Sequence, residues 1–508
     1  MLAAQTRPAF EAADIHRSPT ALNPYTFISG GVLRGERYDL RKATVLDMIR
    51  FAYGVDPESI FGGANWLEFD RFDVAAKAPA GTPPATVRLM LQSLLADRFK
   101  LVIHKETRPM PSFVLRSGKG KPRLREPAAD ALPDCVSGTT GWSCHNMTMA
   151  AFAQRLKGIA GDYLVEPVVD ATGIDGMWDF DFHWNRRSQV LAPGVERVTV
   201  FDAIDKQLGL SLPLEKLPAP VLVIDRVNEK PTENPPDTAQ KLPPRDLAFE
   251  VADLKPSRHG APGGGTWVTP GGGFDAIAMD MRVLLATAWD VDWDHMERFA
   301  GLAGWMESAK FDIHARASTQ TNSPPLMGAG YIDDDVRLML RALLIDRFQI
   351  QWHYEDRLVD AQTLAAGSKP KMKKGDMSVR ASCREARTVA NDPRDLNPRL
   401  SQLLVCTNAT LAQFASQLQA LEPDDFAYPP NDATGLTGTW DFTLSFSPAW
   451  MTRPGASGQA PARVASEPNG AVSLADAISK QLGLKLETRK RKLPVIVIDH
   501  MQEKPSGN

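Results

Sequence analysis

The chain has 508 residues, of which 43% are hydrophobic and 23% are charged, so it can form at least two ordinary hydrophobic cores. Its formal net charge of -3 and its pI near 6.3 give no basic surface of the kind that nucleic acids require, and we expect no nucleic-acid partner. Apolar runs such as 221–224 and 495–498 are far shorter than the ~20 residues of a membrane-spanning helix, so no transmembrane segment is expected in this chain.

The first ten residues, MLAAQTRPAF, resemble the last part of a secretory signal peptide, because small residues precede the expected mature start. No basic region and no apolar region of signal-peptide length stand before them in the sequence. We expect a signal peptide that is truncated or absent from the given start, and the expectation of a periplasmic or secreted protein rests on the cysteines considered below.

The chain repeats itself once along almost its whole length. RLMLQSLLADRFKLVIHKE, from Arg88, reappears as RLMLRALLIDRFQIQWHYE from Arg337, and further matching segments follow in the same order. They include DATGIDGMWDF with DATGLTGTWDF, and DAIDKQLGL with DAISKQLGL. A segment rich in proline and polar residues separates the copies and is typical of a linker. We place the first copy at 5–231, the linker at 232–245 and the second copy at 246–508.

A weaker repeat lies inside each copy. LVIHKETRPMPSFVL and LSLPLEKLPAPVLVI have the same spacing, which aligns Glu106 with Glu215 and Pro109 with Pro218. Each of these segments follows a predicted helix, so each copy is expected to contain two similar lobes. The lobes lie at about 5–125 and 135–231 in the first copy, and at about 246–372 and 383–508 in the second.

Within a lobe, the pattern predicts a strand or hairpin, a helix, a strand, a second helix and a closing hairpin. The expected positions are 45–53 and 149–158 for the first helix, near Phe72 and Trp178 for the strand, and 88–99 and 201–208 for the second helix. Leu91, Leu94 and Leu95 have helical i, i+3, i+4 spacing, whereas Val221 and Val223 alternate as in a strand. The predicted class is α+β, with helices packed on small mixed or antiparallel sheets.

Four landmarks together resemble a known family. They are the FE-x-A-D-x-KPS opening, the LL-x-DRF segment that ends in H-x-E, the DATG-x-x-G-x-WDF turn and the QLGL run that ends in V-x-VID. The chain resembles the uncharacterised soil-associated protein family, which occurs in large paralogous sets in soil bacteria. The resemblance implies a module of about this length behind a signal peptide, here present as two tandem copies. It implies no function, because none is known for the family.

The four cysteines form two pairs at equivalent places, each just before the first helix of a second lobe. We expect one disulfide between Cys135 and Cys144 and another between Cys383 and Cys406, which would place the chain in an oxidising compartment. Four buried thiols are the alternative. One pair in each copy, without a histidine at ligand spacing, provides too few ligands for zinc, so no metal and no other cofactor is expected.

Two pairs of polar motifs have both a structural and a functional interpretation. The Asn-x-Thr motifs at 146–148 and 408–410 could be glycosylation sites, but each stands at a helix start, where Asn or Thr accepts a backbone N–H as a cap. Asp170 and Asp432, in Asp-Ala-Thr-Gly, could bind a metal, but an aspartate before glycine is typical of a turn. We expect caps and turns.

Two groups of basic residues are interpreted as structural. Arg98 and Arg347 follow an aspartate at a predicted helix end, where an ion pair or a contact with the helix dipole is expected. The basic run at 489–492 is interpreted as a solvated turn.

His104 with Glu106, and His353 with Glu355, are the only repeated candidates for a binding site. On a strand, residues i and i+2 point to the same side, so each imidazole would lie beside a carboxylate. That arrangement suits a metal-ligand pair or a general base with its orienting acid, but it also suits a contact that fixes strand register. Glu215 repeats the glutamate in the second lobe without the histidine, which favours a structural role.

No sequence motif of a known catalytic site is present, and we expect no catalytic residue. The composition, the duplication and the cysteine pairs favour a non-catalytic extracytoplasmic protein that binds an unknown protein or small-molecule ligand. The alternative is a metal-dependent or His/Glu-based hydrolase that uses the histidines of the repeated H-x-E motif.

Overall fold

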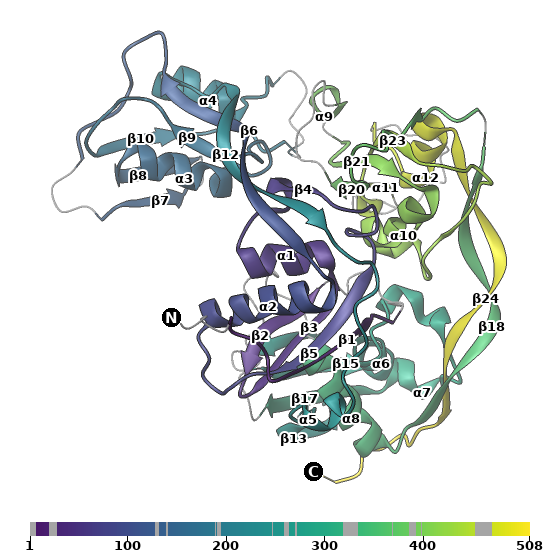
Figure 1. Cartoon of the computed structure of the whole chain (residues 1–508). Coiled ribbons are helices and arrows are strands. Elements are labelled where there is room, and N and C mark those ends of the chain that lie inside the picture. The colour runs from purple at the N-terminus through teal and green to yellow at the C-terminus, as the bar shows by residue number, and fades with distance from the viewer. Residues whose placement is uncertain are drawn as a thin grey trace, which may run out of the picture.

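The computed structural model confirms an α+β protein made of two similar copies, and its described residues form four lobes that are joined in pairs by two long ribbons (Figure 1). It describes residues 7–19, 28–127, 132–138, 141–187, 189, 195–245, 247–258, 264–269, 272–317, 334–367, 369–385, 393–397, 399–452 and 470–507. Over these ranges, no helix combines the length and the apolar composition needed to cross a membrane.

The first lobe of the first copy packs two helices on a four-stranded antiparallel sheet with the strand order β1-β5-β3-β2. The strands are β1 (Ala12–Arg17), β2 (Ser29–Arg34), β3 (Arg37–Thr44) and β5 (Arg71–Lys77); the helices are α1 (Val45–Tyr53) and α2 (Pro84–Arg98). Helix α1 begins at a capping box of Thr44 with Asp47 and ends at Gly54, whose φ of 65° favours glycine. Ile49 of α1 and Leu95 of α2 are fully buried in the core between these layers.

The second lobe of the first copy repeats this plan with a smaller sheet of order β10-β8-β7. Its elements are β7 (Asp134–Ser137), β8 (Trp142–Met147), α3 (Met149–Ile159), β9 (Val168–Asp170), β10 (Trp178–Phe182), α4 (Val200–Leu208) and β11 (Leu210–Ser211). Phe152 of α3 contacts Phe180 of β10 edge to face, with ring centroids 4.7 Å apart, in a core separate from that of the first lobe.

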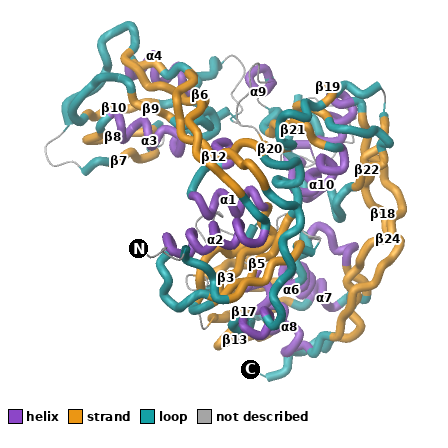
Figure 2. Tube along the Cα trace, viewed as in Figure 1, coloured by secondary structure: helices purple, strands orange, loops and turns teal. Residues whose placement is uncertain are grey.

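The closing hairpin expected in each lobe is wrong. The two closing strands, β6 (Val102–Ser117) and β12 (Leu214–Arg226), instead pair with each other along an antiparallel ribbon that joins the lobes, as Figure 2 shows. Short parallel strands extend the ribbon at its two ends: β4 (Ile60–Gly62) pairs with β12, and β9 pairs with β6. Leu222 and Ile224 of β12 return to the core of the first lobe. The ribbon therefore belongs to both lobes.

The second copy has the same architecture. Its first lobe contains β13 (Phe249–Pro256), β14 (Gly265–Thr269), β15 (Gly273–Asp280), α6 (Met281–Ala288), η2 (Trp293–Arg298), β16 (Phe299–Ala300), α7 (Trp305–Ser308), β17 (Lys310–Ala317) and α8 (Asp334–Phe348). Its second lobe contains β19 (Lys373–Lys374), β20 (Ser382–Glu385), α9 (Pro393–Leu396), β21 (Gln402–Ala409), α10 (Leu411–Leu421), η3 (Pro423–Asp425), β22 (Asn431–Ala433), β23 (Trp440–Phe446), α11 (Ala449–Thr452), α12 (Leu474–Ala477) and η4 (Ile478–Leu482).

The second ribbon pairs β18 (Gln351–Ala366) with β24 (Leu484–His500). The basic run at 489–492 lies in the middle of β24, so its interpretation as a turn is wrong. Arg489 binds Glu487 on its own strand and Lys490 binds Asp360 across the ribbon. Because charged side chains oppose further strand pairing, this run protects the exposed centre of the ribbon.

Every lobe enters its first helix through the same backbone device. Two residues before each helix cap, a residue takes positive φ, and an aspartate on the neighbouring strand accepts its backbone N–H. The four pairs are Lys42 with Asp73 (2.9 Å), Asn146 with Asp179 (2.7 Å), Ala278 with Asp312 (2.8 Å) and Asn408 with Asp441 (2.6 Å). The predicted caps at the second-lobe helices are confirmed, with Thr148 and Thr410 as the capping residues.

The predicted turn role of the Asp-Ala-Thr-Gly motifs is also confirmed. Asp170 accepts hydrogen bonds from the backbone N–H and the hydroxyl of Thr172, at 2.9 and 2.8 Å. Asp432 makes the same two bonds with Thr434, at 2.9 and 2.7 Å. The carboxylates are used within their own turns.

The arginine at the end of α2 holds the linker. Arg98 is buried and donates to the backbone carbonyl of Thr232, at 3.1 Å from Nε, and to the side chain of Asn234. Asn234 also accepts the backbone N–H of Ile15 on β1. Arg98 therefore does not form the expected helix-end ion pair, whereas Arg347 lies 3.7 Å from Asp346 as expected. The linker, which includes the short helix α5 (Thr238–Lys241), lies against the first copy at this point.

Candidate functional site

The repeated histidines lie on the two ribbons, and their partner is an aspartate. His104 Nδ1 lies 2.9 Å from both carboxylate oxygens of Asp225, near the end of the opposite strand. His353 Nδ1 lies 2.8 Å from Asp499 in the same way. The imidazole of His104 is 51% exposed. Each histidine therefore fixes the pairing of two ribbon strands, and its second ring nitrogen makes no hydrogen bond to any residue that the structure describes.

The glutamates of the H-x-E motifs do not join the histidines. Glu106 binds Arg108 at 2.8 Å and Glu355 binds Arg357 at 2.6 Å, both two residues further along the same strand. In the described parts of the chain, no group of three His, Cys, Asp or Glu side chains is placed to hold a metal ion. The expected imidazole–glutamate pair is therefore not formed, and a binding role for these residues stays a prediction.

The cysteine pairs expected from the sequence are brought to disulfide distance. Cys135 faces Cys144 across β7 and β8 with the Cα atoms 4.1 Å apart, and Cys383 faces Cys406 across β20 and β21 with the Cα atoms 4.0 Å apart. Each pair joins the outer strand of a second-lobe sheet to its neighbour. In both copies the cross-link would fix the strand that leads into α3 or α10.

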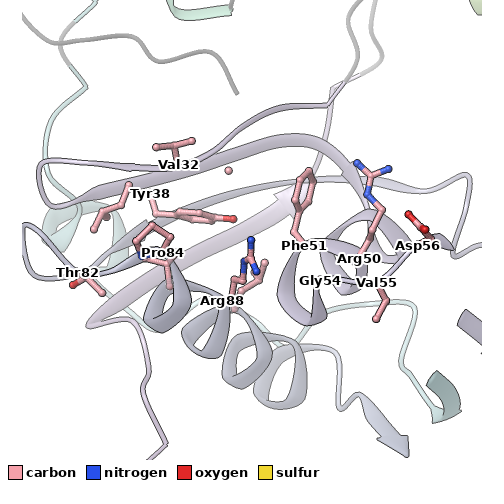
Figure 3. A pocket seen from close by; sticks show the side chains of 14 residues that line it. Val32, Tyr38, Arg50, Phe51, Gly54, Val55, Asp56, Thr82, Pro84 and Arg88 are labelled. Atoms are coloured by element: carbon pink, nitrogen blue, oxygen red, sulfur yellow. The ribbon is translucent and has the colours of Figure 1, made fainter. Parts of the chain in front are cut away.

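A pocket that sequence reasoning missed lies in the first lobe of the first copy. It has a volume of about 590 Å³ and opens between the β2–β3 hairpin, the end of α1 and the start of α2 (Figure 3). Leu33, Phe51 and Leu91 are among its apolar lining residues. Its size is that of a small-molecule site.

Four polar side chains line this pocket without an ion pair or hydrogen bond to any described residue: Tyr38, Arg50, Asp56 and Arg88. Tyr38 is only 2% exposed, and Figure 3 shows its hydroxyl pointing toward Arg88. Burial raises the pKa of Tyr38, so the hydroxyl keeps its proton and can donate. Arg88 of α2 and Arg50 of α1 form no ion pair with a described carboxylate, although Arg50 lies near Asp56 in Figure 3 and its guanidinium lies 5.0 Å from the centre of the Phe51 ring.

The equivalent face of the second copy is already occupied, and the first copy occupies it. Lys42, at the end of β3, places its ammonium 3.6 Å from Asp290 and 3.7 Å from Asp334. The hydroxyl of Ser29 donates to Asp334 at 3.0 Å. Arg337 binds Asp290 and lies 3.3 Å from Asp334. One copy therefore binds the other through the β2–β3 hairpin and the helix face of α6 and α8.

Further contacts close this junction. Asp335 of α8 binds Arg34 of β2 and Arg245 of the linker. The void left between these elements measures only about 20 Å³. Small residual volume and paired charges are what a formed interface requires.

A second junction joins the first lobe of the first copy to the second lobe of the second copy. The carboxylate of Glu68 is 6% exposed and lies between two arginines, with Arg380 Nε at 3.1 Å and Arg384 Nη2 at 2.5 Å. Asn65 accepts the backbone N–H of Ala381 at 2.9 Å. Among the residues that the structure describes, the two copies therefore touch at two places, and both use the first lobe of the first copy.

The two copies differ in the residues that decide whether the helix face is open. The helix caps Thr44 and Asp280, and the arginines Arg88 and Arg337, set the structural equivalence. The equivalent pairs, with the first-copy residue first, are Tyr38 and Phe274, Arg50 and Ala286, Gly54 and Asp290, Ala85 and Asp334, and Thr86 and Asp335. Compared with the second copy, the first copy lacks three acids and has two additional hydroxyls and one additional cation at these positions. This difference was visible in the sequence, but a search for shared residues does not find it.

These features define a class: a tandem pair of two-lobed α+β domains, each closed by a ribbon that its two lobes share. The chain belongs to the family described as Protein of unknown function (DUF3738), whose model matches residues 46–227 and 282–501. The expectation of an uncharacterised family present in two copies is confirmed. No curated protein and no solved structure matches the chain.

Proposed function

We propose that this chain is a non-catalytic extracytoplasmic binding protein from a soil bacterium. The observation that carries the proposal is the contact between the copies, because it is an instance of one family domain recognising another. The helix face of α6 and α8 receives Lys42, Ser29 and their neighbours through acids that the first copy lacks. The helix face of the second copy carries acids that fit its occupant, and the same face of the first copy lacks them. A face whose residues change while the fold is kept is what we expect of a binding module.

The extracytoplasmic location is supported by the cysteine pairs. Cys135 with Cys144, and Cys383 with Cys406, each stand directly opposite on neighbouring strands. Disulfides at such positions persist in oxidising compartments and are rare in the cytosol.

The hydrolase alternative retains one observation. His104 with Asp225, and His353 with Asp499, have the geometry of a base that is oriented by a carboxylate. Both pairs are half exposed and lie on the ribbons, away from the pocket of the first lobe. A histidine in that position is open to solvent, and its substitution is expected to affect strand pairing and not turnover.

Two measurements test the proposal. Wild type and the double variant His104→Gln with His353→Gln are compared on ester, peptide, glycoside and phosphoester substrates, where both are expected to stay at background. A wild-type turnover that the double variant loses with its fold intact would make the protein a hydrolase.

The second measurement addresses recognition between the copies. Lys42→Met removes the first-copy cation from Asp290 and Asp334, which then pair only with Arg337 of their own copy, and is expected to enlarge the radius of gyration in solution scattering. Lys42→Arg should keep the compact form, and Lys105→Met, on the exposed ribbon, is the matched control. An unchanged radius for Lys42→Met would contradict the proposed recognition.

A further inference from the structure

The open pocket of the first copy has an unpartnered donor at its base. Tyr38 is almost fully buried, and its hydroxyl makes no hydrogen bond to a described residue. The hydroxyl faces the pocket and is not a fully buried atom without a partner, so a ligand oxygen can accept its hydrogen bond in place of water. In the second copy the equivalent residue is Phe274, which has no hydroxyl to donate. The hydroxyl is therefore specific to the copy whose pocket is open.

The second feature is a retained cation that has lost its acids. In the second copy, Arg337 is neutralised by Asp290 and Asp334. Its counterpart Arg88 meets Gly54 and Ala85 at the same two positions. The guanidinium of Arg88 lies 3.5 Å from the point where a side chain on Gly54 would begin. The pocket thus keeps the cation and offers open space where the second copy has a carboxylate.

The remaining wall selects for an apolar body. Phe51, Val55, Val87 and Leu91 line the same volume as Arg88. Asp56 also lines the pocket and lies beside Arg50 in Figure 3. The acid of an anionic ligand is therefore expected at the other end, which Arg88 forms. A volume of about 590 Å³ accommodates a ligand of one or two rings.

We propose that this pocket binds a small organic anion with an apolar body, whose carboxylate or similar acid takes the place that Asp290 holds in the second copy. The proposal rests on the proposed binding function and adds the class of ligand. Arg88 forms the ion pair, Tyr38 donates to the same acid, and the apolar residues enclose the body of the ligand.

A second molecule of this chain fits the pocket poorly. The contact between the copies depends on Lys42 meeting Asp290 and Asp334, and the residue equivalent to Lys42 in the second copy is Ala278. The first-copy face has Gly54 and Ala85 in place of those acids. Neither half of the contact would be present in a head-to-tail dimer, so the charge pattern favours a separate acidic ligand.

The test uses naphthalene-2-carboxylate and its neutral analogue 2-naphthamide as probes, with binding measured by calorimetry on the full chain. The carboxylate is expected to bind about tenfold or more tightly than the amide, because a bond to a charged group contributes more than a neutral one. Equal affinities, or no saturable binding of the carboxylate up to about 1 mM, would overturn the inference.

Variants distinguish binding in this pocket from non-specific binding of the probes. Arg88→Met should weaken carboxylate binding about tenfold or more, and Tyr38→Phe, which copies Phe274, should weaken it several-fold. Gly54→Asp supplies the missing acid at a backbone position where Asp290 already stands with a φ of 59°, and it should weaken binding as much as Arg88→Met. Arg155→Met, which removes an exposed cation in the other lobe, is the control and should leave affinity unchanged.

Each outcome has one interpretation. Full affinity in Gly54→Asp, with thermal stability like that of wild type, would contradict a role for Arg88. Failure of the probes leaves the proposed function standing if the Lys42 variants behave as expected, because those variants test recognition between the copies and not this pocket.

Discussion

Pro109 on β6 and Pro218 on β12 are direct cross-strand neighbours, and they are also the two residues that the repeat within the first copy aligns with each other. Both relations hold only if a two-fold axis relates the lobes and passes between the two residues. Leu358 and Lys492 mark the same point in the second copy. The ribbon is therefore the symmetry element of the domain.

Proline at this centre also has a protective role. A proline has no N–H, so a directly opposed pair must stand where the backbone groups of both strands point outward. Each proline removes one outward donor from an edge that could pair with another chain. In the second copy, Lys492 replaces one of the prolines and a charge performs the same task.

Removal of Glu68 is expected to destabilise the chain by about 3 kcal/mol, because it leaves Arg380 buried without its anion. Burial already lowers the pKa of Arg380, which shows how strongly that guanidinium depends on its partner. Glu68→Ala is measured by urea denaturation at neutral pH. Glu307→Ala is the matched control, since Glu307 is the equivalent residue of the second copy and is 69% exposed. Equal losses in the two variants would contradict a special role for the junction.

The stability of the chain should depend on pH through Asp312. The hydroxyl of Ser257 and the backbone N–H of Ala278 donate to its carboxylate and lower the pKa of Asp312 below its ordinary value. The ionised form is therefore favoured by folding, so its contribution is complete above about pH 4, the unfolded value, and is lost as the pH falls through the folded pKa.

Asp312→Asn should flatten the acid limb of the stability curve. The urea midpoint is measured between about pH 2 and pH 6, which spans the ordinary pKa of aspartate. Asp346→Asn changes an exposed carboxylate and should keep the wild-type slope. If Asp312→Asn left the slope unchanged, the hydrogen bonds to Asp312 would not contribute to the pH dependence of stability.

Each disulfide is expected to stabilise its second lobe by about 2 to 4 kcal/mol. The bond between Cys383 and Cys406 closes a loop of 23 residues against 9 for Cys135 and Cys144, so its loss should cost about 1 kcal/mol more. Peptide mapping without reductant checks the pairing, and Cys→Ser pairs measure the stability. Links between the copies, or four thiols that alkylate in exported protein, would contradict it.

The proposed domain boundary at the linker can be tested by proteolysis. Asn234 contacts Arg98 and Ile15, so the linker of the wild type is expected to resist cleavage. Asn234→Ala releases these contacts and should give two fragments that correspond to 5–231 and 246–508. Asn228→Ala, just before the linker, keeps the backbone bond from Asn228 to Phe99 and removes no side-chain hydrogen bond to a described residue, so it serves as the control. Cleavage throughout both copies, with the linker intact, would argue against two domains.

The helices were predictable because their signals are local. Leu91, Leu94 and Leu95 are buried on α2 as their spacing predicted, and Thr148 caps α3 with a residue that stands beside it in the sequence. The exchange of closing strands was not predictable in this way. A strand such as β12 has the same alternation whether its partner lies in its own lobe or in the other one.

The candidate site failed to emerge from the sequence for a different reason. Residues that both copies share, such as His104 and His353, are the obvious candidates, but both copies use them to pair the ribbon strands. The pocket is marked by Gly54 and Tyr38, which the second copy does not share. These differences become visible only when the helix caps Thr44 and Asp280 are superimposed as equivalent positions.

The shared ribbon restricts how proteins of this family can grow or shrink. A lobe on its own would carry a closing strand as long as the 16 residues of β6 with no partner for its backbone. Gain or loss of one lobe is therefore penalised by aggregation, whereas gain or loss of two together is tolerated. Proteins of this kind are therefore expected to contain an even number of lobes, as this chain does with a second pair of lobes after the first.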